Sequence, residues 1–189
     1  NPHRYGQAGV WRPVRNHLYQ VDRKNTESQF THINTDGEYQ RFTRFDFADP
    51  GNNPENRWVR REEMTRYSPY GFALESKDAN EIPSSMLFGY GNSKAVAKAA
   101  NAGYYEVAFD GFEDHGSAYS SGHGHLALSS TSGSVSLSDV QAHSGGKCAA
   151  TIAGQQFTIS TTVGNSVLSN WVPEPQQRYT VSAWVRANN

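Results

Sequence analysis

The charged residues of this 189-residue chain are concentrated in its first 110 residues, and this break constrains the fold more than any other feature. Of the 35 Lys, Arg, Asp and Glu side chains, 28 precede residue 111. The 79 residues that follow hold seven charged residues and 29 Gly, Ser or Thr. Because such a shift in composition separates structural regimes, we expect two regions, 1–110 and 111–189, with the boundary near Asp110.

Aliphatic residues are scarce in both regions. Leu, Ile, Val and Phe together supply 33 of the 189 residues, a low share for a folded chain. The net charge is only −1 and 23 residues are aromatic, which argues against disorder. We expect a fold that buries aromatic more than aliphatic side chains and takes part of its core from a neighbour. We interpret the chain as a segment of a larger protein, in which Asn1 is an internal or processed start.

The first region has the pattern of short strands between turns, irregular and rich in turn residues. Asp36-Gly37 is a hairpin signal, and residues 49–54 (Asp-Pro-Gly-Asn-Asn-Pro) form a break that a central strand would not contain. One short helix is predicted over Ser93–Ala102, with Ser93 as N-cap, alanines inside and Gly103 after its end. The predicted strands of this region are Phe30–Ile33, Tyr39–Phe47, Trp58–Tyr67 and Phe72–Asp78.

The second region has the pattern of an antiparallel β-sandwich. Its apolar segments are short, often alternate with polar residues, and are separated by Gly/Ser turns. The sandwich is expected to be incomplete, because few strands are available and the chain stops soon after Val185. The predicted strands are Tyr105–Asp110, His125–Leu128, Val135–Val140, Cys148–Ile152, Gln156–Thr162 and Tyr179–Val185.

Several motifs of the first region resemble a known family. The opening around Trp11-Arg12-Pro13, the stretch Tyr67–Asp78, the run from Leu87 to Asn101 and the closing Asp110–Asp114 are similar to a module of very large surface proteins of Bacteroidota-type bacteria. These proteins are related to RHS/YD-repeat proteins, whose strands wind into large shells. Residues 142–147 and Tyr179–Val185 resemble jelly-roll domains of the carbohydrate-binding-module type. The resemblance implies an extracellular or cell-surface location and a jelly-roll-like sandwich.

The same resemblance implies a structural calcium ion. In such jelly rolls a carboxylate and backbone carbonyls hold the ion, and here Glu113 or Asp114 would act with carbonyls of Gly145–Lys147. Calcium prefers six to eight oxygen ligands, which these segments do not supply alone. No other cofactor is suggested by the sequence.

A glycan-binding surface is predicted at the last segment. If Val181, Ala183 and Val185 face the core, strand alternation turns Trp184 outward. Its ring can then stack on the apolar face of a sugar, and Arg186 can bond a hydroxyl or carboxylate beside it. Packing of Trp184 under a loop or against the first region is the alternative. Trp171 is a weaker candidate, since nearby prolines place it in a turn.

No catalytic signature is present in the sequence. A Gly-x-Ser-x-Gly elbow is missing, and no facing carboxylate pair of the glycosidase kind is indicated. His123-Gly124-His125 offers two imidazoles for zinc but no third ligand at a set spacing, and the single Cys148 does not complete a site. Near-neutral charge argues against nucleic acid as a partner, and no apolar run reaches the roughly 20 residues of a membrane span.

These observations favour a non-enzymatic structural or binding segment of a large secreted or cell-surface bacterial protein, with glycan and the rest of a larger polypeptide or assembly as partners. Two alternatives remain: part of an RHS-like shell that encloses a toxin, or an accessory domain that anchors an enzyme to glycan. The three differ in the domains that would follow this segment.

Overall fold

The protein is almost entirely β-structure. The computed structural model describes residues 9–20, 44–49, 57–116, 124–131, 135–139, 142–151, 153–161 and 176–186. Its only helical element in these ranges is the single 3-10 turn η2, so the prediction of a mostly β, antiparallel chain is confirmed. The strands and this turn are β1 (Arg15–Tyr19), β2 (Trp58–Tyr67), β3 (Ala73–Asp78), β4 (Pro83–Gly89), β5 (Lys94–Ala100), η2 (Tyr104–Glu106), β6 (Leu126–Ser130), β7 (Ser136–Ser138), β8 (Cys148–Ala150) and β9 (Phe157–Thr161).

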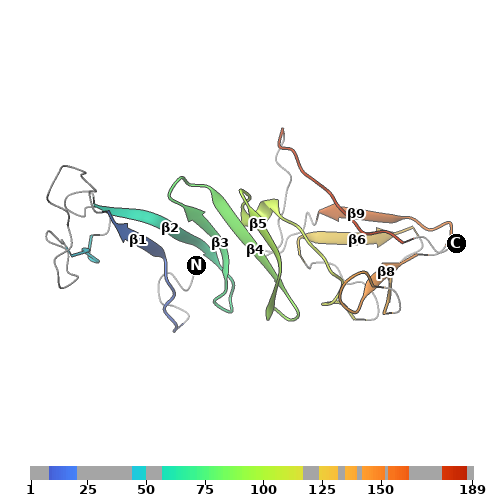
Figure 1. Cartoon of the computed structure of the whole chain (residues 1–189). Coiled ribbons are helices and arrows are strands. Elements are labelled where there is room, and N and C mark those ends of the chain that lie inside the picture. The colour runs from blue at the N-terminus through green and yellow to red at the C-terminus, as the bar shows by residue number, and fades with distance from the viewer. Residues whose placement is uncertain are drawn as a thin grey trace, which may run out of the picture. The chain divides into compact units, whose positions relative to one another are not determined.

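Strands β1 to β5 form one antiparallel sheet in which sequence order is also spatial order (Figure 1). The predicted strands at Trp58–Tyr67 and Phe72–Asp78 are confirmed as β2 and β3. By its internal contacts the chain divides into two compact units. Unit 1 comprises residues 1–65 and 76–82, and unit 2 comprises residues 66–75 and 83–189.

The segment predicted as a helix is instead strand β5. It pairs with β4 from Ser84↔Ala100 to Gly89↔Lys94. The turn that joins them holds Tyr90, Gly91 and Asn92 at φ values of 53°, 65° and 63°, left-handed values that are typical of a tight turn between two hairpin strands. An Ala/Lys segment this short is also marginal as a helix. Pairing with β4 therefore outweighs its intrinsic helix propensity.

Strand β4 supplies the clearest buried face in unit 2. Ser85, Leu87 and Gly89 alternate along it and are buried, as expected for a strand with one covered face. On the neighbouring segment Phe72 stacks on Phe88, with ring centroids 4.7 Å apart. Among the described residues only three apolar side chains are buried, and these are Leu74, Leu87 and Val135.

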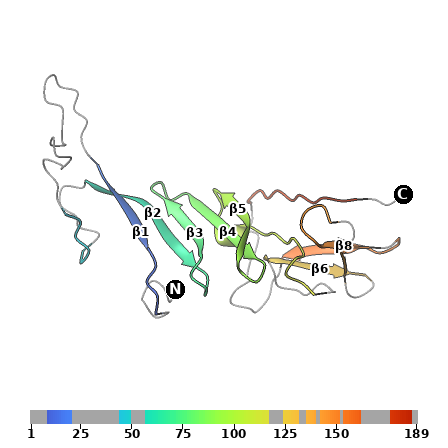
Figure 2. The same ribbon diagram turned by 60° about the horizontal axis from the view of Figure 1, so that its bottom comes forward.

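The described strands after residue 111 form two small antiparallel sheets, β6 with β9 and β7 with β8. Register runs from Leu126↔Thr161 to Ser130↔Phe157 in the first and from Ser136↔Ala150 to Ser138↔Cys148 in the second. Figure 2 shows β6 and β8 from another side. The four predicted strands in this stretch are thus confirmed at their centres.

Two other predicted strands of the second region are wrong. Tyr105–Asp110 is not extended as a strand, because η2 occupies Tyr104–Glu106 and residues 107–110 pair with no strand. Tyr179–Val185 is likewise not a strand. Val181 and Val185 are both exposed, so the expected core-facing alternation of this segment does not occur.

Some predictions lie outside the described residues. These include the strand Phe30–Ile33, the Asp36-Gly37 turn, residues 50–54, His123 and Trp171. Of the predicted strand Tyr39–Phe47, residues 44–47 are described and belong to no strand. In the described part of the chain, no helix has the length and apolar character that crossing a membrane requires.

Replacing Leu87 by alanine should destabilise unit 2 strongly. Leu87 is 2 % exposed, and Leu→Ala changes in cores cost about 2–5 kcal/mol of unfolding free energy. Denaturant unfolding followed by circular dichroism measures this loss. Val185→Ala is the matched control, because this exposed side chain should change stability by less than about 0.5 kcal/mol. A loss below about 1 kcal/mol for Leu87→Ala would contradict a core at β4.

Candidate functional site

The segment Asp110–His115 forms the centre of unit 2, because its carboxylates bind backbone N–H groups of separate loops. Asp110 begins the arrangement. Its Oδ1 accepts a hydrogen bond from the Phe112 N–H at 2.7 Å, and its Oδ2 lies 2.8 Å from His115 Nε2. Both side chains of this Asp–His pair are buried. The pair closes a tight local turn, since a short acidic side chain readily binds the amide two residues on.

Glu113 connects this turn to the loop before β8. Its Oε1 accepts hydrogen bonds from the N–H groups of Gly146 at 2.6 Å and Lys147 at 2.8 Å. The Lys147 ammonium donates in return to the carbonyl of His115. Hydrogen bonds to an ionised group contribute roughly 1.5–3 kcal/mol each, more than neutral ones. Charge-assisted bonds in both directions therefore hold the two loops together.

Asp114 connects the same segment to the β4–β5 turn. Its Oδ2 accepts from the Tyr90 N–H at 2.8 Å and its Oδ1 from the Gly91 N–H at 2.6 Å. The close approach depends on Gly89, where a Cβ atom would lie 2.6 Å from Asp114 Oδ2. Both oxygens of this carboxylate are thus committed to one turn.

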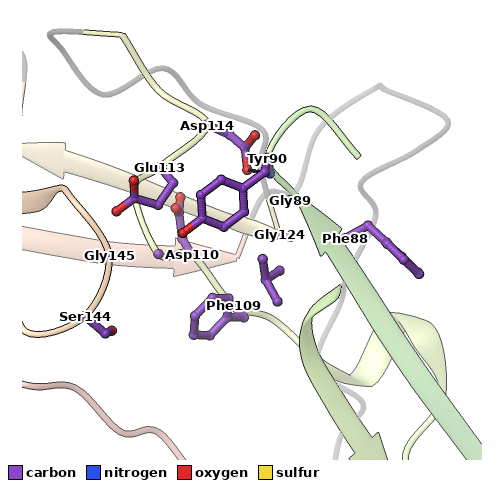
Figure 3. Close-up of a pocket in the computed structure, with 12 residues that line it drawn as sticks. Phe88, Gly89, Tyr90, Phe109, Asp110, Glu113, Asp114, Gly124, Ser144 and Gly145 are labelled. Atoms are coloured by element: carbon purple, nitrogen blue, oxygen red, sulfur yellow. Dashed lines mark hydrogen bonds between the residues drawn. The ribbon is translucent and has the colours of Figure 1, made fainter. Parts of the chain in front are cut away.

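These contacts surround a pocket of about 180 Å³. Figure 3 shows the carboxylates of Asp110, Glu113 and Asp114 around the Tyr90 side chain, with Phe109 on another side of the pocket. Because amide N–H groups already bind each carboxylate, the acidic groups serve mainly to position the walls. The pocket is small, and the hydrogen bonds around it hold separate loops together. We call this region the junction.

The predicted calcium residues occupy this junction but face different partners. Glu113 does meet the Gly145–Lys147 loop, as expected, yet it meets amide N–H donors rather than the carbonyl oxygens that Ca²⁺ binds. Asp114 is directed to Tyr90 and Gly91. Throughout the described ranges no three His, Cys, Asp or Glu side chains gather as a metal site. Within the described ranges backbone amides bind both carboxylates, and calcium stays a prediction from the resemblance.

Burial and turn geometry at this junction differ from expectation. The sequence predicts buried Phe109 and Phe112 with a turn at Gly111, whereas Phe109 is 40 % exposed and Phe112 is half-buried. The left-handed residue is Phe112, at φ 66°, rather than Gly111. Its conformation is held by the Asp110 carboxylate on its own N–H, which offsets the cost of a positive φ for a bulky residue.

The predicted glycan residues lie on an open surface of unit 2. Trp184 is 80 % exposed and stacks on the imidazole of His143, with ring centroids 4.1 Å apart and planes within 9°. Arg186 is also exposed. The indole is therefore outward-facing as expected, but through a stack on a loop histidine and not through strand alternation. Nothing in the sequence pattern indicates the His143 contact.

A second feature that the sequence does not indicate is a cluster of Arg66, Tyr104, Tyr105 and His125. The Arg66 guanidinium lies 4.5 Å from the Tyr105 ring centroid and donates to the Tyr105 hydroxyl at 3.2 Å. Tyr104 meets the His125 ring edge-on at 4.7 Å. These residues come from β2, η2 and the turn just before β6, so only the tertiary fold brings them together.

His125 is buried in this cluster and sits at φ 65°. Its Nδ1 lies 2.7 Å from the Val107 carbonyl and therefore carries the proton, while Nε2 has no hydrogen-bond partner in the described part of the chain. Burial lowers the pKa of His125 below its usual 6.5 and the Arg66 charge lowers it further, against the opposing effect of the Val107 carbonyl. The same burial raises the pKa of Tyr104. The histidine of the predicted zinc pair is thus a neutral core residue.

Comparisons of the chain with protein-family models, with curated proteins and with solved structures found no match.

Gly145→Ala should destabilise unit 2 more than Gly91→Ala, which is its matched control. Both glycines have a left-handed φ, 75° and 65°, so both variants carry the same backbone strain. A Cβ at Gly145 would lie within contact distance of Glu113 Oε1, whereas none would meet an atom within 4 Å at Gly91. We expect an additional loss of about 1.5–3 kcal/mol for Gly145→Ala as the Glu113 hydrogen bonds break. Equal losses in denaturant unfolding would contradict this role of Glu113.

The stability of unit 2 should fall as pH decreases from about 7 into the acidic range. The folded state holds the His125 pKa below that of the unfolded chain, so the unfolded state binds the proton more readily and gains population. His125→Asn should reduce this pH dependence, because asparagine keeps an N–H for the Val107 carbonyl, tolerates a positive φ and does not titrate. Thermal melts of both proteins across this range measure the effect. An unchanged slope in His125→Asn would contradict the assignment.

Proposed function

We propose that this chain is a non-enzymatic structural and binding segment of a large secreted or cell-surface bacterial protein, and that it binds glycan at Trp184 and Arg186. The resemblance of its motifs to RHS/YD-repeat-type surface proteins and to carbohydrate-binding jelly rolls supports the location and the class of ligand. In this proposal the small sheets β6–β9 and β7–β8 belong to a jelly-roll-like sandwich.

The observation that carries the glycan proposal is the exposed stack of Trp184 on His143. A flat indole that is largely open to solvent offers the apolar surface on which a sugar ring packs, while polar groups beside it bond hydroxyls. The parallel contact at 4.1 Å orients the ring before any ligand arrives. Preorganisation of this kind favours binding, because less side-chain freedom is lost on association.

The structural part of the proposal is supported by how unit 2 is held together. Few apolar side chains are buried in the described residues, and they are Leu74, Leu87 and Val135. Polar contacts from Asp110, Glu113 and Asp114 tie its loops instead. A segment of this kind suits a long surface protein in which neighbouring parts of the polypeptide cover the remaining apolar surface.

Screening the chain on a glycan array, followed by calorimetric titration of the glycans retained, tests the proposal. Trp184→Ala should abolish or weaken binding at least about tenfold, while the unfolding free energy changes by less than about 0.5 kcal/mol because the indole is exposed. Trp11→Ala is the matched control, since Trp11 is 79 % exposed and lies in unit 1.

No glycan binding by the wild-type chain would overturn the proposal. So would equal binding by Trp184→Ala and wild type. Loss of stability in Trp184→Ala would make the tryptophan structural and the segment architectural only.

A further inference from the structure

Unit 1 contains an aromatic pocket that the function proposed above does not use. Arg44, Phe45, Phe47 and Trp58 line a hollow of about 450 Å³, a volume within the roughly 300–1,000 Å³ of small-molecule sites. Phe47 is 86 % exposed although it is a large apolar ring. An exposed ring beside an apolar hollow is informative, because proteins expose apolar patches mainly at binding surfaces.

The rings of this pocket meet nearly at right angles. Phe45 lies 5.0 Å from Phe47 at an interplanar angle of 70°, and 5.5 Å from Trp58 at 81°. Two ring planes in this arrangement form an apolar corner rather than a flat wall. A corner presents aromatic surface to two sides of a ligand ring at once, which a single exposed side chain cannot do.

Residues of β1 hold the inner rings of the corner in place. His17 lies 4.6 Å from Phe45, and Tyr19 lies 5.0 Å from Trp58 in an edge-on contact. Alternate residues of a strand share one face, so His17 and Tyr19 support the two rings from the same side. The pocket is thus built on the β1–β2 pair, where Tyr19↔Trp58 are direct partners.

A tight turn carries Phe47 outward. Asp46 Oδ1 accepts hydrogen bonds from the N–H groups of Ala48 at 2.8 Å and Asp49 at 3.3 Å. This side-chain cap defines the backbone on either side of Phe47. The exposed ring is therefore held by a hydrogen-bonded turn.

Arg44 gives the pocket a positive charge. Within the described ranges Arg44 forms no ion pair, whereas Arg15 on β1 and Arg60 on β2 are engaged. Arg15 and Arg60 both bind Glu63, at 3.2 and 2.8 Å. Burial favours a raised pKa for Glu63, but its hydrogen bonds and charge attraction with these arginines lower it. Arg60 also binds Glu81. The guanidinium at the pocket thus stays available to a ligand.

We infer that this pocket binds a uronic acid unit of an acidic glycan. The apolar corner receives the C–H faces of the sugar ring, and the planar guanidinium of Arg44 binds the carboxylate through two parallel N–H···O bonds. A neutral sugar would leave the guanidinium without its counter-charge. The inference rests on the proposed role in glycan binding, but concerns a different site in a different unit.

Calorimetric titration of the full chain with short galacturonic acid oligomers tests the inference. The matched probe is the same oligomer with its carboxylates methyl-esterified, which keeps the sugar rings and removes the charge. We expect saturable binding of the acid form, at least about tenfold weaker binding of the ester, and weakening with added salt. Phe47→Ala should weaken binding of the acid form about tenfold, and Arg44→Gln should abolish the preference for acid over ester.

Two variants of unit 1 serve as controls that should bind like wild type. Trp11→Ala removes an exposed ring outside the pocket, and Arg61→Gln removes an exposed charge on β2. Denaturant unfolding of all variants separates lost binding from lost folding. If Phe47→Ala unfolds, Arg44→Gln carries the test, since it keeps a polar side chain at an exposed position.

Three results would overturn the inference. The first is no binding of the acid oligomer, or equal binding of acid and ester. The second is acid binding that Trp184→Ala abolishes and Phe47→Ala does not, which would assign the ligand to the site proposed above. The third is displacement of the oligomer from this pocket by an acidic peptide or a single-stranded oligonucleotide at lower concentration, which would assign the pocket to a different class of partner.

Discussion

The structure of unit 2 depends on hydrogen bonds between side-chain carboxylates and backbone amides. Within five residues, Asp110, Glu113 and Asp114 bind the N–H groups of three different turns. A loop-rich protein has many amides that no strand partner satisfies, and each unsatisfied buried amide is costly. Ionised carboxylates are strong acceptors for such groups. One acidic segment therefore organises loops that a hydrophobic core of this size would not hold.

This arrangement explains several glycines. The carboxylates approach the backbone so closely that a side chain at Gly89 or Gly145 would collide with them. Small residues at these positions are thus a consequence of the polar contacts. The abundance of glycine and serine after residue 110 fits a structure in which backbone and carboxylates meet directly.

Both proposed ligand surfaces combine exposed aromatic rings with an arginine, yet they differ in shape. Trp184 presents one flat face that rests on His143. Phe45, Phe47 and Trp58 form a corner beside Arg44. A flat face suits stacking along an extended chain, whereas a corner selects the edge and charge of a single unit.

The sequence by itself determined that the chain is mostly antiparallel β-structure and that acidic groups are concentrated at Asp110–Asp114, because strand alternation is a local property of the sequence. The tertiary structure decided that the Ala-rich segment at 94–100 is a strand. The free energy gained by pairing with β4 exceeds the small differences in helix propensity between residue types. The resemblance implied that Glu113 meets the loop at 145–147 through carbonyl oxygens around a calcium ion. In the structure the backbone N–H groups of this loop donate hydrogen bonds to Glu113. The clusters around His125, His143 and Phe45 join residues far apart in the chain. Such contacts carry no local pattern, so only the folded chain specifies them.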